Sequence, residues 1–190
     1  MSAIKTLLAS AAALSVSAGA VLAEPALLFD LGGKFDRSFN EAAYNGAERW
    51  REETGGTYME LEMQSEAQRE QALRRLAERG ANPIVMTGFA FAEVLSQVAP
   101  DYPETSFVII DSVVEGDNVQ SNVFAEGEGS YLAGVMAAMA SESGTVGFIG
   151  GMDIPLIRKF ACGYVQGVRA TNPDATVIQN MTGTTPAAWN

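Results

Sequence analysis

Apolar and polar positions follow two alternating patterns along the chain. Short runs rich in apolar and β-branched residues, typical of strands, occur at 26–31, 58–63, 83–88, 106–111, 119–124, 145–151 and 175–181. Between these runs, apolar residues recur every three or four positions, which is typical of amphipathic helices. Strands that alternate with helices favour parallel sheets joined by crossover helices. We therefore expect an α/β protein.

Two of the expected helices begin with a capping signal. Ser38 is followed three residues later by Glu41, and Ser65 is followed by Gln68. In a capping box, the hydroxyl accepts a backbone hydrogen bond while the longer side chain reaches back to the cap residue. We predict such a box at both starts. The inward faces are predicted to consist of Phe39, Ala43, Ala47 and Trp50 in the first helix and of Leu73, Leu76 and Ala77 in the second.

Acidic, amide and aromatic side chains follow several of the expected strands directly. Parallel sheets of this kind bind ligands beyond the carboxyl ends of their strands, where the strand-to-helix loops meet. Residues far apart in sequence are thereby expected on one rim of the sheet. The first loop contributes Asp30, Lys34, Asp36, Phe39 and Asn40. The third loop contributes Gly88 and Phe89, and the fourth contributes Asp111.

Residues 1–23 have the composition of a secretory signal peptide. Lys5 is followed by small and apolar residues that end in Val21, Leu22 and Ala23, a small-residue cleavage site. A membrane anchor would need about 20 strongly apolar residues, whereas this run is diluted with Ser and Gly. No cysteine follows the run, so a lipid anchor is not expected. We predict a cleaved signal peptide and a periplasmic location.

The remaining chain is strongly acidic and poor in catalytic side chains. Removing residues 1–23 takes away Lys5 and no acid, which leaves 11 Lys and Arg against 23 Asp and Glu, a net charge of −12. Nucleic acid and anionic membranes are poor partners for such a protein. The chain has no histidine and a single cysteine, Cys162. Most nucleophilic and zinc mechanisms, and an internal disulfide, are therefore not expected.

Four linked motifs resemble one protein family. "GGKFDRSFNEAAYNGAERW", "VIIDS", "FAEGEGSYLAGVMAA" and "GTVGFIGGMDIPLIRKFACGYVQGV", in this order and spacing, resemble the basic membrane protein family of periplasmic substrate-binding proteins. That family includes purine nucleoside receptors of ABC transporters. The resemblance runs from about residue 26 to the last residue, and it implies a ligand-capturing transport component with no catalytic activity and no cofactor.

The resemblance also implies a fold and its boundaries. It implies a type I periplasmic binding protein, with two doubly wound parallel-sheet lobes that close over a ligand. The expected parts are the signal peptide at 1–23, an N-terminal lobe at 24–124 and the start of a second lobe at 125–190. Members of the family continue for well over a hundred residues more, so we expect this chain to hold an incomplete second lobe.

Two residues at the start of the first expected helix match ligand-binding positions of the family. For each of them, a structural role is the alternative. Asp36 could accept hydrogen bonds from a purine edge or a ribose diol, or it could be a helix N-terminal charge. Asn40 could contact the ligand or bond locally. Many relatives have a second acid where this chain has Arg37, so its ligand preference is expected to differ from theirs.

Aromatic residues supply the other half of the expected site. Phe39 and Phe160 could stack on the two faces of a base, with packing inside the protein as the alternative for both. Gly88 and Phe89 match a glycine-aromatic step of the family, although Phe91 could be the inward ring of that turn. Asp111, at the end of "FVIID", is placed for ribose hydroxyls or a base N–H, with a loop cap as its alternative.

This acidic and aromatic rim favours one ligand class. Phosphate favours bare helix N-termini, and two carboxylates beside such a terminus would repel it. A nucleoside, neutral and rich in hydroxyls with a flat apolar face, fits both the acids and the rings, whereas a plain sugar explains fewer of the aromatics. We expect a monomer that delivers a nucleoside, purine by preference, to the membrane permease of an ABC transporter.

Three alternatives stay open at this point. The protein could bind a sugar or another small molecule, or it could dock on a sensor protein instead of a permease. It could also be a dinucleotide-binding enzyme domain, but "LGGKFDRSFN" lacks the G-x-G-x-x-G spacing of such domains.

Overall fold

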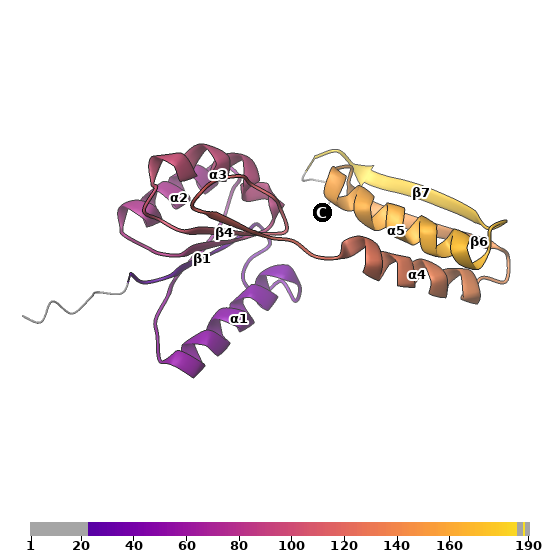
Figure 1. Ribbon diagram of the computed structural model, residues 1–190, viewed down its shortest axis with the longest axis horizontal. Coiled ribbons are helices and arrows are strands. Elements are labelled where there is room, and N and C mark those ends of the chain that lie inside the picture. Colours follow the sequence, from indigo (N-terminus) through magenta and orange to yellow (C-terminus); the bar gives the residue numbers. More distant parts are fainter. Residues whose placement is uncertain (1–22, 186–187, 189–190) are drawn as a thin grey trace, which may run out of the picture.

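The computed structural model describes residues 23–185 and residue 188, so the expected signal peptide at 1–22 lies outside the described residues. Two α/β units lie side by side and are joined by one short segment after β5 (Figure 1). None of the helices described is long and apolar enough to cross a membrane.

The first unit contains a five-stranded parallel sheet. Its strands are β1 (Ala26–Phe29), β2 (Met59–Glu62), β3 (Ile84–Thr87), β4 (Phe107–Ile110) and β5 (Val119–Asn122). Their order in the sheet is β2-β1-β3-β4-β5, and each neighbouring pair is parallel. Because β1, β3 and β4 are adjacent and in register, the loops that follow them lie at one edge.

Helices lie on both faces of this sheet (Figure 1). The helix α2 (Gln68–Glu78) and the helix α3 (Ala92–Val98), which is flanked by the short 3-10 turns Phe89–Phe91 and Ala99–Asp101, cover one face. The main core lies there, and its fully buried members include Leu28, Leu73, Ile84, Met86, Phe91, Leu95 and Phe107. The helix α1 (Phe39–Thr54) lies on the opposite face.

The apolar face of α1 borders a groove rather than a closed core. A space of about 470 Å³ separates the helix from the sheet and is lined by Leu27, Ala43, Ala47, Trp50 and Val85, among others. Only Asn40 is buried within α1. The predicted inward face of α1 therefore points to the sheet at Ala43, Ala47 and Trp50, but it is packed loosely.

The second unit consists of two parallel strands and two helices. These are α4 (Glu126–Ala140), β6 (Thr145–Met152), α5 (Pro155–Thr171) and β7 (Thr176–Gly183). The helices cross in close contact because glycines stand at the crossing. A methyl group on Gly163 would overlap the carbonyl oxygen of Gly127, and one on Gly134 would overlap that of Tyr164.

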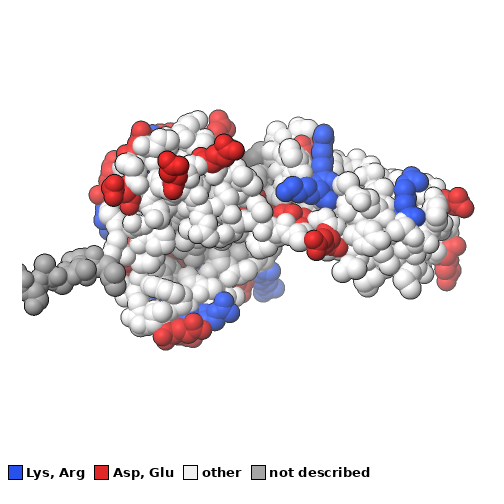
Figure 2. Space-filling model, viewed as in Figure 1, with Lys and Arg blue, Asp and Glu red and all other residues white. Residues whose placement is uncertain are grey.

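Acidic side chains occur on both units (Figure 2). On the face shown in Figure 2, they spread across the first unit, and a small group of basic side chains stands at the end of the second unit that faces the first. Arg158 and Lys159, in the first turns of α5, belong to that end.

All seven predicted strands are present, and a helix follows each of β1, β2, β3, β5 and β6, but the two predicted capping boxes are wrong. The hydroxyl of Ser38 makes no cap hydrogen bond. The carboxylate of Asp36 instead accepts the backbone N–H groups at the start of α1. At α2, the side chain of Gln68 accepts the backbone N–H of Gln64 (2.9 Å), and Ser65 takes no part through its side chain. At α1 the carboxylate of Asp36 thus replaces the hydroxyl of Ser38, whereas at α2 the backbone carbonyls of Ser65 and Glu66 accept the N–H groups of Gln68 and Arg69.

Candidate functional site

The turn between β1 and α1 is held together by Asn40, which is 3% exposed. Its Oδ1 accepts hydrogen bonds from the backbone N–H of Asp30 (3.1 Å) and from the hydroxyl of Thr87 (2.8 Å). Its amide nitrogen donates to the carbonyl oxygens of Asp30 and Gly33, both at 3.1 Å. Both polar atoms of Asn40 are therefore engaged inside the protein, which favours its local role.

Asp36 caps the amino terminus of α1. Its Oδ1 accepts the N–H groups of Ser38 (2.8 Å) and Glu41 (3.1 Å), and its Oδ2 accepts that of Asn40 (3.1 Å). Burial acts to raise the pKa of Asp36, but the backbone donors of Asn40, Glu41 and Ser38 outweigh it and lower the pKa below its ordinary value. The side chain stays ionised and shapes the turn, while direct ligand contact by Asp36 stays a prediction.

Asp30 at the end of β1 is paired with an arginine. Its Oδ1 accepts hydrogen bonds from Nε (3.1 Å) and Nη2 (2.7 Å) of Arg69, a buried residue of α2. The guanidinium also lies over the ring of Phe91, 5.6 Å from its centroid. Gly88 packs against Asp30, since an added methyl group would lie 3.6 Å from Oδ2. This part of the rim is neutralised and closely packed.

Asp111 at the end of β4 is different, because its carboxylate accepts no hydrogen bond from the described residues. Its backbone has φ of 72°, a left-handed conformation that aspartate adopts more readily than most residues, and its N–H donates to the carbonyl of Asn122 (2.7 Å). Burial first, and the negative charge of Glu126 second, raise the pKa of Asp111, while Lys159 acts to lower it. A half-buried carboxylate that accepts no hydrogen bond from the described residues is available to a donor from outside the protein.

The predicted aromatic residues are partly exposed, as a stacking role requires. Phe39 is 37% exposed at the start of α1, and Phe89 and Phe160 are half-buried. Phe91 is fully buried, so it is the inward ring of the turn after β3, as the sequence suggested. Phe160 lies on α5 in the second unit, whereas the other predicted residues lie in the first.

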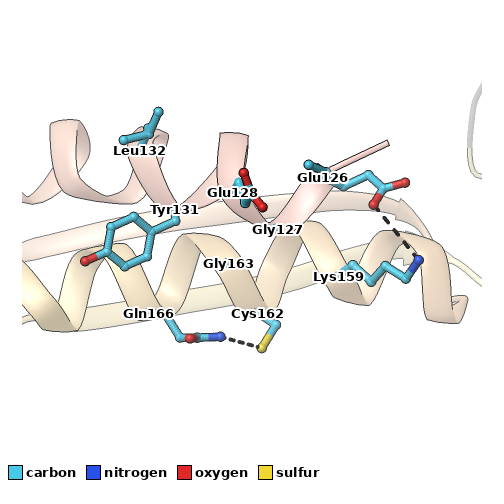
Figure 3. A pocket seen from close by; sticks show the side chains of 10 residues that line it. Glu126, Gly127, Glu128, Tyr131, Leu132, Lys159, Cys162, Gly163 and Gln166 are labelled. Atoms are coloured by element: carbon cyan, nitrogen blue, oxygen red, sulfur yellow. Dashed lines mark hydrogen bonds and ion pairs between the residues drawn. The ribbon is translucent and has the colours of Figure 1, made fainter. Parts of the chain in front are cut away.

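A residue that was not predicted, Glu126, stands where the two units meet. It opens α4, its side chain is 5% exposed, and its Oε1 has no hydrogen-bond partner among the described residues. Its Oε2 lies 4.0 Å from Nζ of Lys159. Figure 3 shows the carboxylate pointing to that lysine at one end of a groove of about 700 Å³ along α4 and α5.

Glu126 was missed because an acid in the first turn of a helix is usually a solvated charge that interacts favourably with the helix dipole. The signal that could have found it is the pair of glycines on the two helices, Gly127 and Gly163. They let α5 approach the start of α4 so closely that the acid becomes buried.

Most of the predicted site residues lie at one edge of the first sheet. The structure brings six of the seven predicted residues to one edge of the first sheet, through the loops after β1, β3 and β4, and the seventh, Phe160, lies in the second unit. Within residues 23–185 and 188, no group of three or more His, Cys, Asp and Glu side chains is placed to hold a metal ion.

Residues 23–187 match the family model described as "ABC transporter substrate-binding protein PnrA-like". The ABC transporter nucleoside-binding protein BmpA of Lactococcus lactis subsp. cremoris is 36% identical over 159 residues, which are 80% of this chain and 45% of that protein. An uncharacterized lipoprotein of Pyrococcus furiosus is 39% identical over 172 residues, which are 84% of this chain and 42% of that protein. The chain thus spans less than half the length of these relatives.

A solved structure of an ABC transporter solute-binding protein from Aeropyrum pernix K1 is similar to this one. The TM-score is 0.76 at 34% identity, over 88% of this chain and 50% of that one. The corresponding protein of Conexibacter woesei matches with a TM-score of 0.60 at 26% identity, over 86% of this chain. Both likenesses extend across the two units. The chain therefore belongs to the Bmp family of PnrA-like ABC transporter substrate-binding proteins.

Proposed function

We propose that this protein is a periplasmic receptor that captures a nucleoside, by preference a purine nucleoside, between its two units and delivers it to the permease of an ABC transporter. The observation that carries the proposal is the open carboxylate of Asp111 at the carboxyl edge of the first sheet, beside the second unit. The name of the relative from Lactococcus lactis, a nucleoside-binding protein, supports the same ligand class.

The charges at the junction favour hydroxyl groups over phosphate. Asp111 is half-buried and Glu126 is buried. The positive charge of Lys159 attracts both carboxylates. Two carboxylates against one ammonium group repel an anion, whereas a ribose diol can donate a hydrogen bond to each carboxylate. A nucleoside fits this field, and a nucleotide does not.

In this proposal, the flat base of the nucleoside stacks on aromatic side chains. Phe39 from the first unit and Phe160 from the second are the stacking partners in this proposal, with Gly88 and Phe89 beside them at the rim. Stacking of a base on an aromatic ring stabilises complexes with nucleic acids by about 1–3 kcal/mol per base. Asp36 and Asn40 hold the turn that positions Phe39, and Asp36 still has lone pairs to offer a ligand.

Closure of the two units over the ligand is the proposed working motion. The segment between β5 and α4 is short and joins the units where Asp111 and Glu126 lie. A ligand that contacts both units stabilises their closed arrangement, and the permease would recognise that arrangement.

A thermal-shift comparison of the complete gene product tests the ligand class. The panel is guanosine, inosine, adenosine, ribose, AMP and NAD. A ligand at about 100 times its Kd adds about 2.7 kcal/mol to the stability of the protein, which gives a clear rise in Tm. We expect a rise with at least one nucleoside and none with AMP. A rise with ribose alone, or with NAD alone, would overturn the nucleoside assignment.

A further inference from the structure

Among the described residues, Oε1 of Glu126 is the one buried side-chain polar atom that has no hydrogen-bond partner. Its side chain is 5% exposed, and no donor reaches Oε1 within hydrogen-bond distance. An ionised carboxylate that is buried without donors destabilises a protein, so such a group is normally paired. The unpaired oxygen of Glu126 therefore needs a donor that the described residues do not supply.

Lys159 does not satisfy this need. Its Nζ lies 4.0 Å from Oε2, which is too long for a hydrogen bond, and it does not approach Oε1. The lysine side chain is 55% exposed, so solvent weakens the attraction further. Lys159 supplies part of a balancing charge and leaves one oxygen of Glu126 open.

The position of Glu126 points to a ligand rather than to a missing contact in the core. It opens α4, and the start of α4 and the first turns of α5 stand at the end of the second unit that faces the first (Figure 1). The groove that Glu126 lines runs along both helices from that end. Across the junction, the charge of Glu126 acts directly on Asp111.

We propose that Glu126 is a ligand-binding residue whose buried Oε1 accepts a hydrogen bond from a ribose hydroxyl of the bound nucleoside. The inference rests on the proposed function, and it assigns the sugar to the junction between Asp111 and Glu126. Each carboxylate takes one hydroxyl of the diol, and Lys159 offsets part of the charge. Because one acid belongs to each unit, the diol also links the units in the closed state.

The experiment is isothermal titration calorimetry of guanosine and of its 2′-deoxy and 3′-deoxy analogues with the complete gene product and two variants. Adenosine and its analogues are the probes if guanosine causes no thermal shift. Glu126→Gln keeps the shape of the side chain and removes its charge. Glu128→Gln is the matched control, because Glu128 is an exposed acid in the same first turn of α4.

For Glu126→Gln we expect the affinity for guanosine to fall roughly ten- to hundredfold, which is the range for a hydrogen bond to a charged group. We also expect the variant to discriminate less than the wild type between guanosine and at least one deoxy analogue. Glu128→Gln should bind all three compounds as the wild type does.

Two outcomes would overturn the inference and leave the nucleoside function intact. One is a Glu126→Gln variant that binds guanosine as tightly as the wild type. The other is an equal loss of affinity for guanosine and both analogues, which would mean that Glu126 only supports the fold. A wild-type protein that binds none of the nucleosides would overturn the proposed function itself, together with this assignment.

Discussion

At the scale of single residues, the carboxylate of Asp36 organises the turn from which the site is built. It accepts three backbone N–H groups at the start of α1, and one of them belongs to Asn40, whose own side chain ties the turn to β1 and β3. Because these donors lower the pKa of Asp36, the ionised form stabilises the fold. That contribution is present above the ordinary pKa of the group and is lost as the pH falls through the lowered value.

We predict that Asp36→Ala lowers the free energy of unfolding by about 0.5–2 kcal/mol at neutral pH, as loss of a helix cap usually does. The difference from the wild type should shrink as the pH is lowered from about 7 towards about 3, because the wild-type carboxylate becomes protonated. Urea unfolding of both proteins at several pH values measures this difference in the free energy of unfolding. A difference that grows in acid would contradict this role.

Asp36→Asn is the matched variant, since asparagine is also a good cap. It should keep most of the stability at neutral pH. The affinity of this variant for a nucleoside shows whether Asp36 only caps the helix or also contacts the ligand. Unchanged affinity would mean that the residue only caps α1, and a loss of affinity would support the direct ligand contact predicted from the sequence.

Sequence reasoning could place these residues on one rim, but it could not say which of their polar atoms are already engaged. The strands were predicted to end one or two residues later than their actual ends at Phe29, Thr87 and Ile110, which was close enough to place the loops that follow them. The hydrogen bonds of Asn40 depend on Thr87, 47 positions away, and no local pattern reveals them. Glu126 was missed for the same reason, because its burial depends on α5.

At the scale of elements, the apolar periodicity of the chain predicted every strand and every long helix. The helix starts were predicted less well, because several polar side chains near a start compete for the same few N–H groups. Asp36 reaches those of α1 in place of Ser38. The contact between α4 and α5 was also not predicted, although the glycines that permit it are visible in the sequence.

We predict that Gly163→Ala destabilises the protein by about 1–3 kcal/mol, as overpacking of a tight contact usually does. The added methyl group would overlap the backbone of Gly127, so α4 and α5 would have to separate. The measurement is the free energy of unfolding in urea. Ligand affinity should fall too, because the separation moves Glu126 away from Lys159.

Gly129→Ala is the control for this change. Gly129 lies in α4, and nothing stands within 4 Å of the position that a methyl group would take. Alanine there should stabilise the protein by up to about 1 kcal/mol, because it favours the helix more than glycine does. Equal destabilisation by both variants would contradict the account of the helix contact.

At the scale of the whole molecule, the proposed ligand preference depends on charges that belong to different units. Asp111 lies at the edge of the first sheet and Glu126 at the start of α4, and the negative charge of Glu126 acts on Asp111. A ligand bound between them is therefore selected by its charge as well as by its shape. We expect this junction to accept a neutral nucleoside and to reject its phosphorylated form.

The most direct test is a calorimetric comparison of guanosine with guanosine 5′-monophosphate on the complete gene product, or of the preferred nucleoside with its own monophosphate. We predict that the nucleoside binds at least about a hundredfold more tightly, a difference of about 2.7 kcal/mol, because like charges brought together in a binding site cost several kcal/mol. Equal affinity, or tighter binding of the monophosphate, would contradict the account.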